Sequence, residues 1–209
     1  PDGSTLVYGV QYERAYYADL VRIVSHHLPT GTEEVLTADW DRSAGGWEFI
    51  DDGSLVFHAE DEGHVRLYTV DLEGGAPIPQ TGTGSNHGAR VGEECFWHRH
   101  ETMAQPPEVA ITHGGHTTLV SGFTTEALAE FDFRPATEIT FAGADGNQIQ
   151  AFVNEPPGFD PDRTWPLLQN VHGGPHNGVT DAWHWRWNTQ VMASAGYVVA
   201  SVNFHGSSS

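Results

Sequence analysis

Apolar residues occur in short runs along residues 1 to about 125, and Gly, Asp and Pro separate these runs. Runs of strand length that are rich in β-branched and aromatic residues predict β-strands. No convincing long helical pattern interrupts them. This part of the chain is therefore predicted to be all β.

An internal repeat organises this β-rich part. Residues 21–37 align without gaps with residues 65–81, an offset of 44 residues. Asp2 to Ser4, before one copy, corresponds to Asp52 to Ser54 before the other, which predicts a turn followed by a strand in each case. Because a repeat of about 44 residues has the length of a four-stranded propeller blade, we interpret each copy as part of a blade.

A third blade is predicted over Ala89 to Leu119, with strands at Glu93–His98 and Glu108–Thr112. Since a closed propeller typically has four to eight blades, about three blades cannot close one. The chain is therefore expected to begin in mid-propeller, with residues 1–126 forming C-terminal blades and residues 127–136 forming a linker.

Residues 137–209 have a different pattern and are predicted to belong to a second domain. Thr137–Phe141 and Ile149–Val153 are two β-rich runs around an Asp-Gly pair, the composition of an antiparallel hairpin. An irregular loop with three prolines extends from Glu155 to Pro161. The second domain is thus predicted to open with an antiparallel pair of strands.

A strand, a helix and a strand are predicted next. Pro166–Val171 is an apolar run too short for a helix. Apolar residues then recur on one face of a predicted helix over Asp181–Ala195, with Asp181 as its N-cap. Tyr197–Val202 is a second run rich in β-branched residues. This order predicts a βαβ unit of a parallel sheet, with both strands apolar on both faces.

The turn after the first of these strands has the sequence His172-Gly173-Gly174-Pro175. Two adjacent glycines let backbone N–H groups approach a ligand without a Cβ in the way, and Pro175 stiffens the chain after them. A glycine turn at the carboxyl end of a central strand is where open α/β sheets bind ligands. We therefore take this turn as the candidate site, with a purely structural turn as the alternative.

Residues 165–206 resemble the first part of the α/β-hydrolase domain of the prolyl oligopeptidase family. The His-Gly-Gly-Pro turn, Arg186–Asn188, Gly196–Val199 and Asn203–Ser207 match motifs typical of the branch that holds acylaminoacyl peptidases and bacterial or fungal dipeptidyl peptidases. The four motifs occur in the order and spacing of that branch. The resemblance implies a partial β-propeller of about three blades followed by the N-terminal part of an α/β-hydrolase domain, residues 137–209.

The resemblance also implies roles for single residues. Gly174 would supply a backbone N–H to the oxyanion hole, Gly173 would permit the turn, and His172 would brace the loop. Pro175 and Trp183 are candidate substrate-binding residues, although a packing role is favoured for Trp183.

The nucleophile of a serine hydrolase is not found in the sequence. No G-x-S-x-G motif occurs, and the family order places the Ser, Asp and His after the motifs seen here. Ser207 to Ser209 match a structural stretch of the family. The triad is therefore expected downstream, in the remainder of the same polypeptide or in a second chain.

The implied function is serine exopeptidase activity on short peptides, with release of acylated amino acids or dipeptides from their N-termini. A propeller binding module with a degenerate hydrolase remnant is the alternative from another class, and an esterase of the same fold is a third. No cofactor is implied. The sequence does not assign a cellular compartment, and it is compatible with a homo-oligomer.

The charge of the chain limits its partners. With 28 acidic and 9 basic residues, the formal net charge is −19. Such a surface disfavours nucleic acids and membrane surfaces, and it fits either plain solvation or attraction of cationic peptide N-termini. The acidic run Glu60 to Glu62 is open to the same two interpretations. No apolar run exceeds strand length, so no membrane span is expected.

Metal chemistry is not expected. The single cysteine, Cys95, excludes a Cys-rich zinc site. His98 and His100 lie two residues apart on one face of a predicted strand, but the sequence offers no recognisable set of further ligands.

Overall fold

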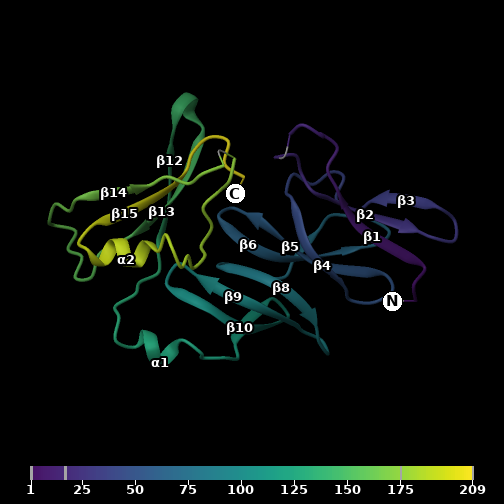
Figure 1. Ribbon diagram of the computed structural model, residues 1–209, viewed down its shortest axis with the longest axis horizontal. Coiled ribbons are helices and arrows are strands. Elements are labelled where there is room, and N and C mark those ends of the chain that lie inside the picture. The colour runs from purple at the N-terminus through teal and green to yellow at the C-terminus, as the bar shows by residue number, and fades with distance from the viewer. Residues whose placement is uncertain (1, 17, 175, 209) are drawn as a thin grey trace.

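A computed structural model describes residues 2–16, 18–174 and 176–208, and its strands form three sheets (Figure 1). The strands are β1 (Thr5–Val10), β2 (Arg22–His27), β3 (Thr32–Val35), β4 (Ala44–Phe49), β5 (Ser54–Asp61), β6 (His64–Asp71), β7 (Ile78–Pro79), β8 (Ser85–Val91), β9 (Phe96–Thr102), β10 (Gln105–His113), β11 (His116–Leu119), β12 (Thr137–Ala142), β13 (Gln148–Asn154), β14 (Leu167–Asn170) and β15 (Val198–Asn203). The helices are α1 (Thr125–Leu128) and α2 (Thr189–Ser194), with a 3-10 turn at Ala144–Gly146.

The first sheet is an antiparallel meander, and the second is antiparallel except at one strand pair. Strands β1, β2 and β3 form one sheet, and strands β4 to β11 form the other. Within the larger sheet, β4 to β7 and β8 to β11 are two groups of four that meet where Val65 of β6 pairs in parallel with Ser85 of β8. The predicted all-β character of this part is confirmed.

The strand β5 shows how these sheets pack. Leu55, Val56 and Phe57 are successive residues that point alternately to opposite faces, and all three are fully buried. Leu55 and Phe57 pack with Ile23 of β2, whereas Val56 packs with Ala89 of β8. The middle group of strands is therefore covered on both faces by its neighbours.

The two copies of the repeat occupy equivalent positions. The Thr37 hydroxyl accepts a hydrogen bond from the Ile23 N–H at 3.0 Å, and the Thr81 hydroxyl accepts one from the Leu67 N–H at 2.9 Å. Leu67 follows Ile23 by 44 residues, and Thr81 follows Thr37 by 44 residues, which is the offset of the sequence alignment. The offset therefore reflects a repeated structure.

The turns before the two copies correct the alignment by one residue. Asp2 Oδ1 accepts from the Ser4 N–H at 2.8 Å, and Asp51 Oδ1 accepts from the Gly53 N–H at the same distance. The structural counterpart of Asp2 is therefore Asp51, whereas the sequence comparison matches it to Asp52. The two adjacent aspartates make the wrong register look equally good.

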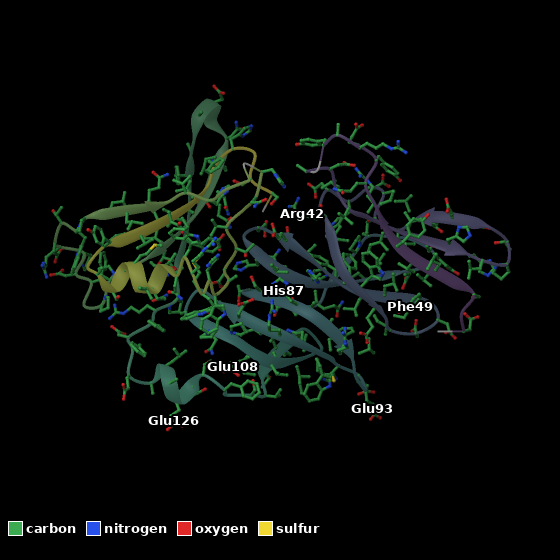
Figure 2. All side chains as sticks on the ribbon, viewed as in Figure 1. Arg42, Phe49, His87, Glu93, Glu108 and Glu126 are labelled. Atoms are coloured by element: carbon green, nitrogen blue, oxygen red, sulfur yellow. The ribbon has the colours of Figure 1, made fainter. Side chains whose placement is uncertain are left out.

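The third group of strands is larger than predicted. The predicted strands 93–98 and 108–112 correspond to β9 and β10, and β8 and β11 flank them. Glu108 of β10 is buried, and both its carboxylate oxygens accept hydrogen bonds from residues 121–124. These bonds tie the segment leading to α1 to the sheet; Figure 2 labels Glu108 in β10 and Glu126 in α1.

The expected linker 127–136 begins inside α1, so its first two residues are helical. The rest of it is a turn, a bend and irregular chain, and it leads into the third sheet.

The third sheet has the strand order β12-β13-β15-β14. The predicted hairpin is confirmed as the antiparallel pair β12 and β13, and the predicted parallel pair is confirmed as β14 and β15. Strand β14 lies at the edge of the described sheet. On this edge strand, Leu167 is 66% exposed.

The predicted helix over Asp181–Ala195 is wrong in its first half. Helix α2 begins after Asn188, whose Oδ1 accepts from the Gln190 and Val191 N–H groups at 2.9 and 3.2 Å. Asp181 does not cap it, because its Oδ1 accepts from the Met103 N–H at 2.7 Å. A contact with a residue distant in sequence thus replaces the local cap.

Candidate functional site

The candidate site is the turn after β14. His172 closes the turn onto the loop after β15: its ring stacks on Phe204 with centroids 4.2 Å apart, and its Nε2 lies 2.9 Å from the Ser207 hydroxyl. Its Nδ1 lies 3.0 Å from the Gly173 carbonyl oxygen. The ring therefore links the ends of two neighbouring parallel strands.

Of the two glycines in this turn, Gly174 is the one whose position requires glycine. Its φ is +131°, and a Cβ built on it would lie 2.6 Å from the Asn177 backbone nitrogen and 2.7 Å from that of His176. A Cβ on Gly173 would meet nothing within 4 Å, and its φ is not positive. Side chains are thus excluded at Gly174 by both conformation and space. Pro175 lies outside the described residues.

Ser207 and His172 do not form a nucleophile and base. The Ser207 hydroxyl lies 2.7 Å from the Phe204 carbonyl oxygen, to which it can donate. A catalytic base is normally oriented by a carboxylate on its second nitrogen, whereas here that nitrogen faces the Gly173 carbonyl. The arrangement fits the structural role expected for Ser207, and Ser208 donates to Glu60 at 3.1 Å.

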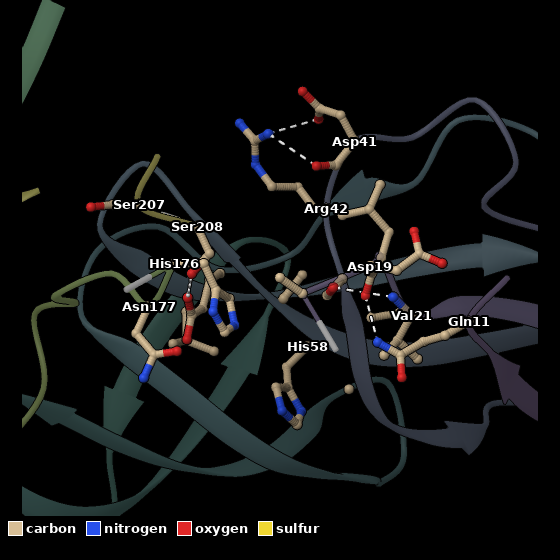
Figure 3. Close-up of a pocket in the computed structure, with 18 of the residues that line it drawn as sticks. Gln11, Asp19, Val21, Asp41, Arg42, His58, His176, Asn177, Ser207 and Ser208 are labelled. Carbon is tan, nitrogen blue, oxygen red and sulfur yellow. Dashed lines mark hydrogen bonds and ion pairs between the residues drawn. The ribbon is translucent and has the colours of Figure 1, made fainter. Parts of the chain in front are cut away.

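A cavity of about 590 Å³ lies between this region and the first two sheets (Figure 3). His176, Asn177 and residues 206–208 form one side, and residues of the β1–β2 loop and of β4 and β5 form the other. The turn thus leads directly into residues that line a space large enough for a short peptide.

Neutral and paired groups line much of this cavity. Arg42 forms ion pairs with Asp41 at 2.7 Å and with Asp61 at 3.1 Å. Burial lowers the pKa of His58, and burial together with nearby His58 and Arg99 lowers the pKa of His87 to about 4. Both rings are therefore neutral at pH 7.

The acidic run Glu60 to Glu62 divides in the structure. Glu60 lines the cavity, whereas Asp61 forms ion pairs with Arg42 and Arg66 and accepts from the Tyr68 hydroxyl at 2.7 Å. Glu62 lies in the β5–β6 turn with φ +50°. The run therefore does not act as one patch, and only Glu60 belongs to the cavity wall.

Trp183 lines a second cavity, of about 380 Å³, together with Val171 and His172. Its ring packs against Phe133 and Trp185, with centroids 5.6 Å away in each case. Its buried Nε1 has no hydrogen-bond partner within the described part of the chain. Trp183 thus combines the packing contacts and the cavity position that the sequence leaves as alternatives.

The histidines of β9 have protein partners. His98 Nε2 lies 2.8 Å from the Thr112 hydroxyl, and His100 Nδ1 lies 2.9 Å from Asn86 Oδ1. Among residues 2–16, 18–174 and 176–208, no group of three His, Cys, Asp or Glu side chains is arranged to hold a metal ion. Within the same residues, no helix has the length and hydropathy needed to cross a bilayer.

Sequence reasoning missed the roles of three polar residues that hold segments distant in sequence. Asn203, Gln150 and Asp181 all bond to backbone atoms of segments distant in sequence. The sequence marks Asn203 only as a letter of a motif, and the available signal was an amide at the end of an otherwise apolar strand.

No family model matches the chain, but individual relatives do. The dipeptidyl-peptidase 5 of Aspergillus oryzae is 30% identical to it over 100% of this chain and 30% of its own length. The dipeptidyl-peptidase 5 of Schizosaccharomyces pombe is 28% identical over 99% of this chain and 31% of its own length. The chain thus spans less than a third of the length of these curated relatives.

Solved structures of similar fold also cover the chain. An acylaminoacyl peptidase in complex with a chloromethyl ketone matches 99% of this chain and 32% of its own, with a TM-score of 0.82 and 22% identity. A dipeptidyl peptidase 4 of Porphyromonas gingivalis matches 97% of this chain and 29% of its own, with a TM-score of 0.67 and 19% identity. At the level of the overall fold, these matches confirm the expected combination of a propeller with a hydrolase domain.

These matches agree with the resemblance carried by the four motifs. The relatives align over the whole chain rather than over the turn alone, so the β-rich first part and the βαβ unit support the same assignment. The whole chain is therefore similar to part of the dipeptidyl-peptidase 5 sequences and of the acylaminoacyl peptidase structure, as the resemblance to the prolyl oligopeptidase family predicts.

Proposed function

We propose that the protein containing this chain is a serine exopeptidase that removes dipeptides or acylated amino acids from the N-termini of short peptides. The carrying observation is the His-Gly-Gly turn at the carboxyl end of β14, in a chain that aligns throughout with dipeptidyl-peptidases. None of these relatives is named as a non-catalytic binding module.

In this proposal the turn stabilises the oxyanion of the tetrahedral intermediate. Gly174 supplies the backbone N–H, and its conformation admits no side chain. Gly173 belongs to the same turn, and His172 braces it through Phe204 and Ser207. A preorganised donor of this kind typically contributes about 3 to 4 kcal/mol to transition-state stabilisation.

For the rest of the chain we propose the division expected from the sequence. Residues 1–126 form blades of a propeller, β4 to β7 and β8 to β11 being two of them and β1 to β3 part of a third. Residues 127–136 connect these blades to residues 137–209, the start of the hydrolase domain. Burial of β5 on both faces supports this assignment, because a blade inside a propeller has neighbours on both sides.

The triad is supplied by the remainder of the polypeptide or by a second chain. Strand β14 has a parallel partner on one side, and the side chains of Leu167 and of Val171, just after the strand, are 66% and 67% exposed. Parallel strands are normally buried on both faces. A further parallel strand beside β14, together with the helices that connect it, would cover these residues and bring the carboxyl end of that strand next to the His-Gly-Gly turn.

The test uses the intact protein. It is incubated with dipeptide and acyl-amino-acid chromogenic substrates and with a fluorophosphonate that labels activated serines. We expect turnover, and we expect the labelled serine outside residues 1–209. The ratio of rates on free and acetylated substrates then assigns the released group.

Two results would contradict the proposal. One is the absence of both turnover and labelling in folded intact protein. The other is labelling of a serine within residues 1–209, such as Ser207, with loss of activity when that serine is replaced by alanine.

A further inference from the structure

The chain segment 179–181, shortly after the His-Gly-Gly turn, is held by a side chain from the end of β15. Asn203 is 6% exposed. Its Oδ1 accepts from the Val179 N–H at 2.6 Å, and its Nδ2 donates to the Val179 carbonyl at 2.9 Å. The amide thus pairs with both backbone groups of one residue, as a neighbouring strand would.

The same amide continues to the first part of the molecule. Asn203 Nδ2 also donates to Gln150 Oε1 at 2.9 Å, and Gln150 Nε2 donates to the Glu62 carbonyl at 2.8 Å. Glu62 lies in the β5–β6 turn. Next to it, the Gly63 carbonyl accepts from the Asp181 N–H at 2.7 Å. These bonds close a ring that returns to the segment 179–181.

The ring leaves little room for adjustment. A Cβ on Gly63, which has φ +74°, would lie 2.7 Å from both Gln150 Oε1 and Phe152 Cζ. The other side of the segment is fixed as well, because Asp181 Oδ1 accepts from the Met103 N–H at 2.7 Å. The segment is therefore held from β15, from the β5–β6 turn and from the β9–β10 turn.

We infer that Asn203 is a positioning residue for the oxyanion-binding turn and that Gln150 links it to the β5–β6 turn. The inference rests on the proposed function of Gly174. Asn203 uses both amide hydrogens and its oxygen, so neither a carboxylate nor an apolar side chain reproduces its bonds. Loss of the ring frees the segment 179–181 and lets the preceding turn shift, and misplacement by about 1 Å at a catalytic group costs about 100-fold in rate.

The first experiment measures kcat and KM of the intact protein with a dipeptide chromogenic substrate. For Asn203→Ala we expect kcat to fall by about 10- to 100-fold while KM stays within about threefold, the pattern of an interaction realised in the transition state. For Gln150→Ala we expect a smaller fall of about 3- to 10-fold, because Asn203 keeps both bonds to Val179.

The matched control is Asn154→Ala. Asn154 is 1% exposed in β13 of the same sheet, and its amide has no hydrogen-bond partner in the described part of the chain. We expect kcat within about twofold of the parent, since no bond to the segment 179–181 is lost. An equal loss of kcat in Asn154→Ala and Asn203→Ala would overturn the inference.

The second experiment is amide hydrogen exchange in the same variants. Asn203→Ala should speed exchange in residues 176–181 by about tenfold or more, whereas Asn154→Ala should not. Unchanged exchange and unchanged kcat in Asn203→Ala would overturn the inference. If Asn203→Ala does not fold, the same measurements are made on Gln150→Ala. Inactive parent protein would contradict the proposed function instead, and exchange would still decide whether Asn203 holds the segment.

Discussion

At the scale of single residues, the two glycines of the candidate turn are chemically identical but structurally different. Gly174 has φ +131° and no space for a Cβ, whereas Gly173 is open. Sequence reasoning could identify the pair but could not distinguish its members, because φ and the distance to the Asn177 backbone nitrogen depend on the folded turn. The difference makes the two positions a matched pair of variants.

The first prediction compares Gly174→Ala with Gly173→Ala in the intact protein. The new Cβ at Gly174 would lie 2.6 Å from the Asn177 nitrogen, so the turn must move. We expect kcat to fall by about 100-fold or more, the typical loss of an oxyanion-hole donor. Gly173→Ala should stay within about threefold, since nothing lies within 4 Å of its Cβ. Similar kcat values for both variants would exclude the assignment of Gly174.

The second prediction concerns the buried carboxylate of Glu108. Burial raises its pKa, but hydrogen bonds from Ser121, Thr124 and Phe123 outweigh burial and lower the pKa to about 2. A folded-state pKa below the ordinary value of 4.5 stabilises the folded state above about pH 4.5, and this contribution is lost as the pH falls towards 2.

The measurement is the free energy of unfolding of the intact protein in urea at pH 7 and pH 3. Glu108→Gln should reduce it by about 1.5 to 3 kcal/mol at pH 7, the range for hydrogen bonds to a charged group, and by less at pH 3. The control is Glu126→Gln in α1, where the side chain is exposed (Figure 2). A loss in Glu108→Gln that is equal at both pH values would refute the role of the charge.

At the scale of elements, the repeat predicts equal effects at Thr37 and Thr81. Each buried hydroxyl accepts from the N–H of a buried strand residue, Ile23 in one copy and Leu67 in the other. Replacing either threonine by valine keeps the shape and leaves that N–H without its partner. Each variant should lose about 1 to 3 kcal/mol of unfolding free energy, and the two losses should add. Thr118→Val, at an exposed position of β11, is the control and should change stability by less than about 0.5 kcal/mol.

The elements that the sequence predicts well are those set by local pattern. The hairpin β12–β13 and the parallel pair β14–β15 match the predicted ranges within two residues at their ends, because alternation and β-branched runs specify them. The failure over Asp181–Ala195 has the opposite cause. The local pattern gives Asp181 a capping role, but it bonds to Met103, 78 positions away in sequence. No local pattern contains that contact.

The same limit applies to the ring around Asn203. Its members come from the β5–β6 turn, β13, β15 and the segment after the candidate turn, and their spacing in sequence carries no signal. The sequence identifies the His-Gly-Gly turn through its glycines and its neighbours in the βαβ unit. The contacts around Asn203 form only when the second and third sheets are in place.

At the scale of the whole molecule, residues 1–209 leave large apolar side chains in water. Val171 and Val191 are 67% and 62% exposed, and Trp185 is 74% exposed. Full burial of a large apolar side chain is worth about 1.5 to 3 kcal/mol, so covering several of them is comparable with the net stability of a domain. We therefore expect the surface near β14 and α2 to be covered in the intact protein.

The last prediction compares residues 1–209 expressed alone with the intact protein. The isolated chain should bind a hydrophobic dye, lose cooperativity in urea unfolding and show no hydrolysis of dipeptide substrates above background, because it lacks a recognisable activated nucleophile. Leu167→Glu provides a control: in the isolated chain it changes an exposed residue and should alter stability little, whereas in the intact protein it buries an unpaired charge beside β14 and should cost about 3 kcal/mol or more. Cooperative unfolding of the isolated chain, together with equal effects of Leu167→Glu in both proteins, would mean that nothing packs against this edge.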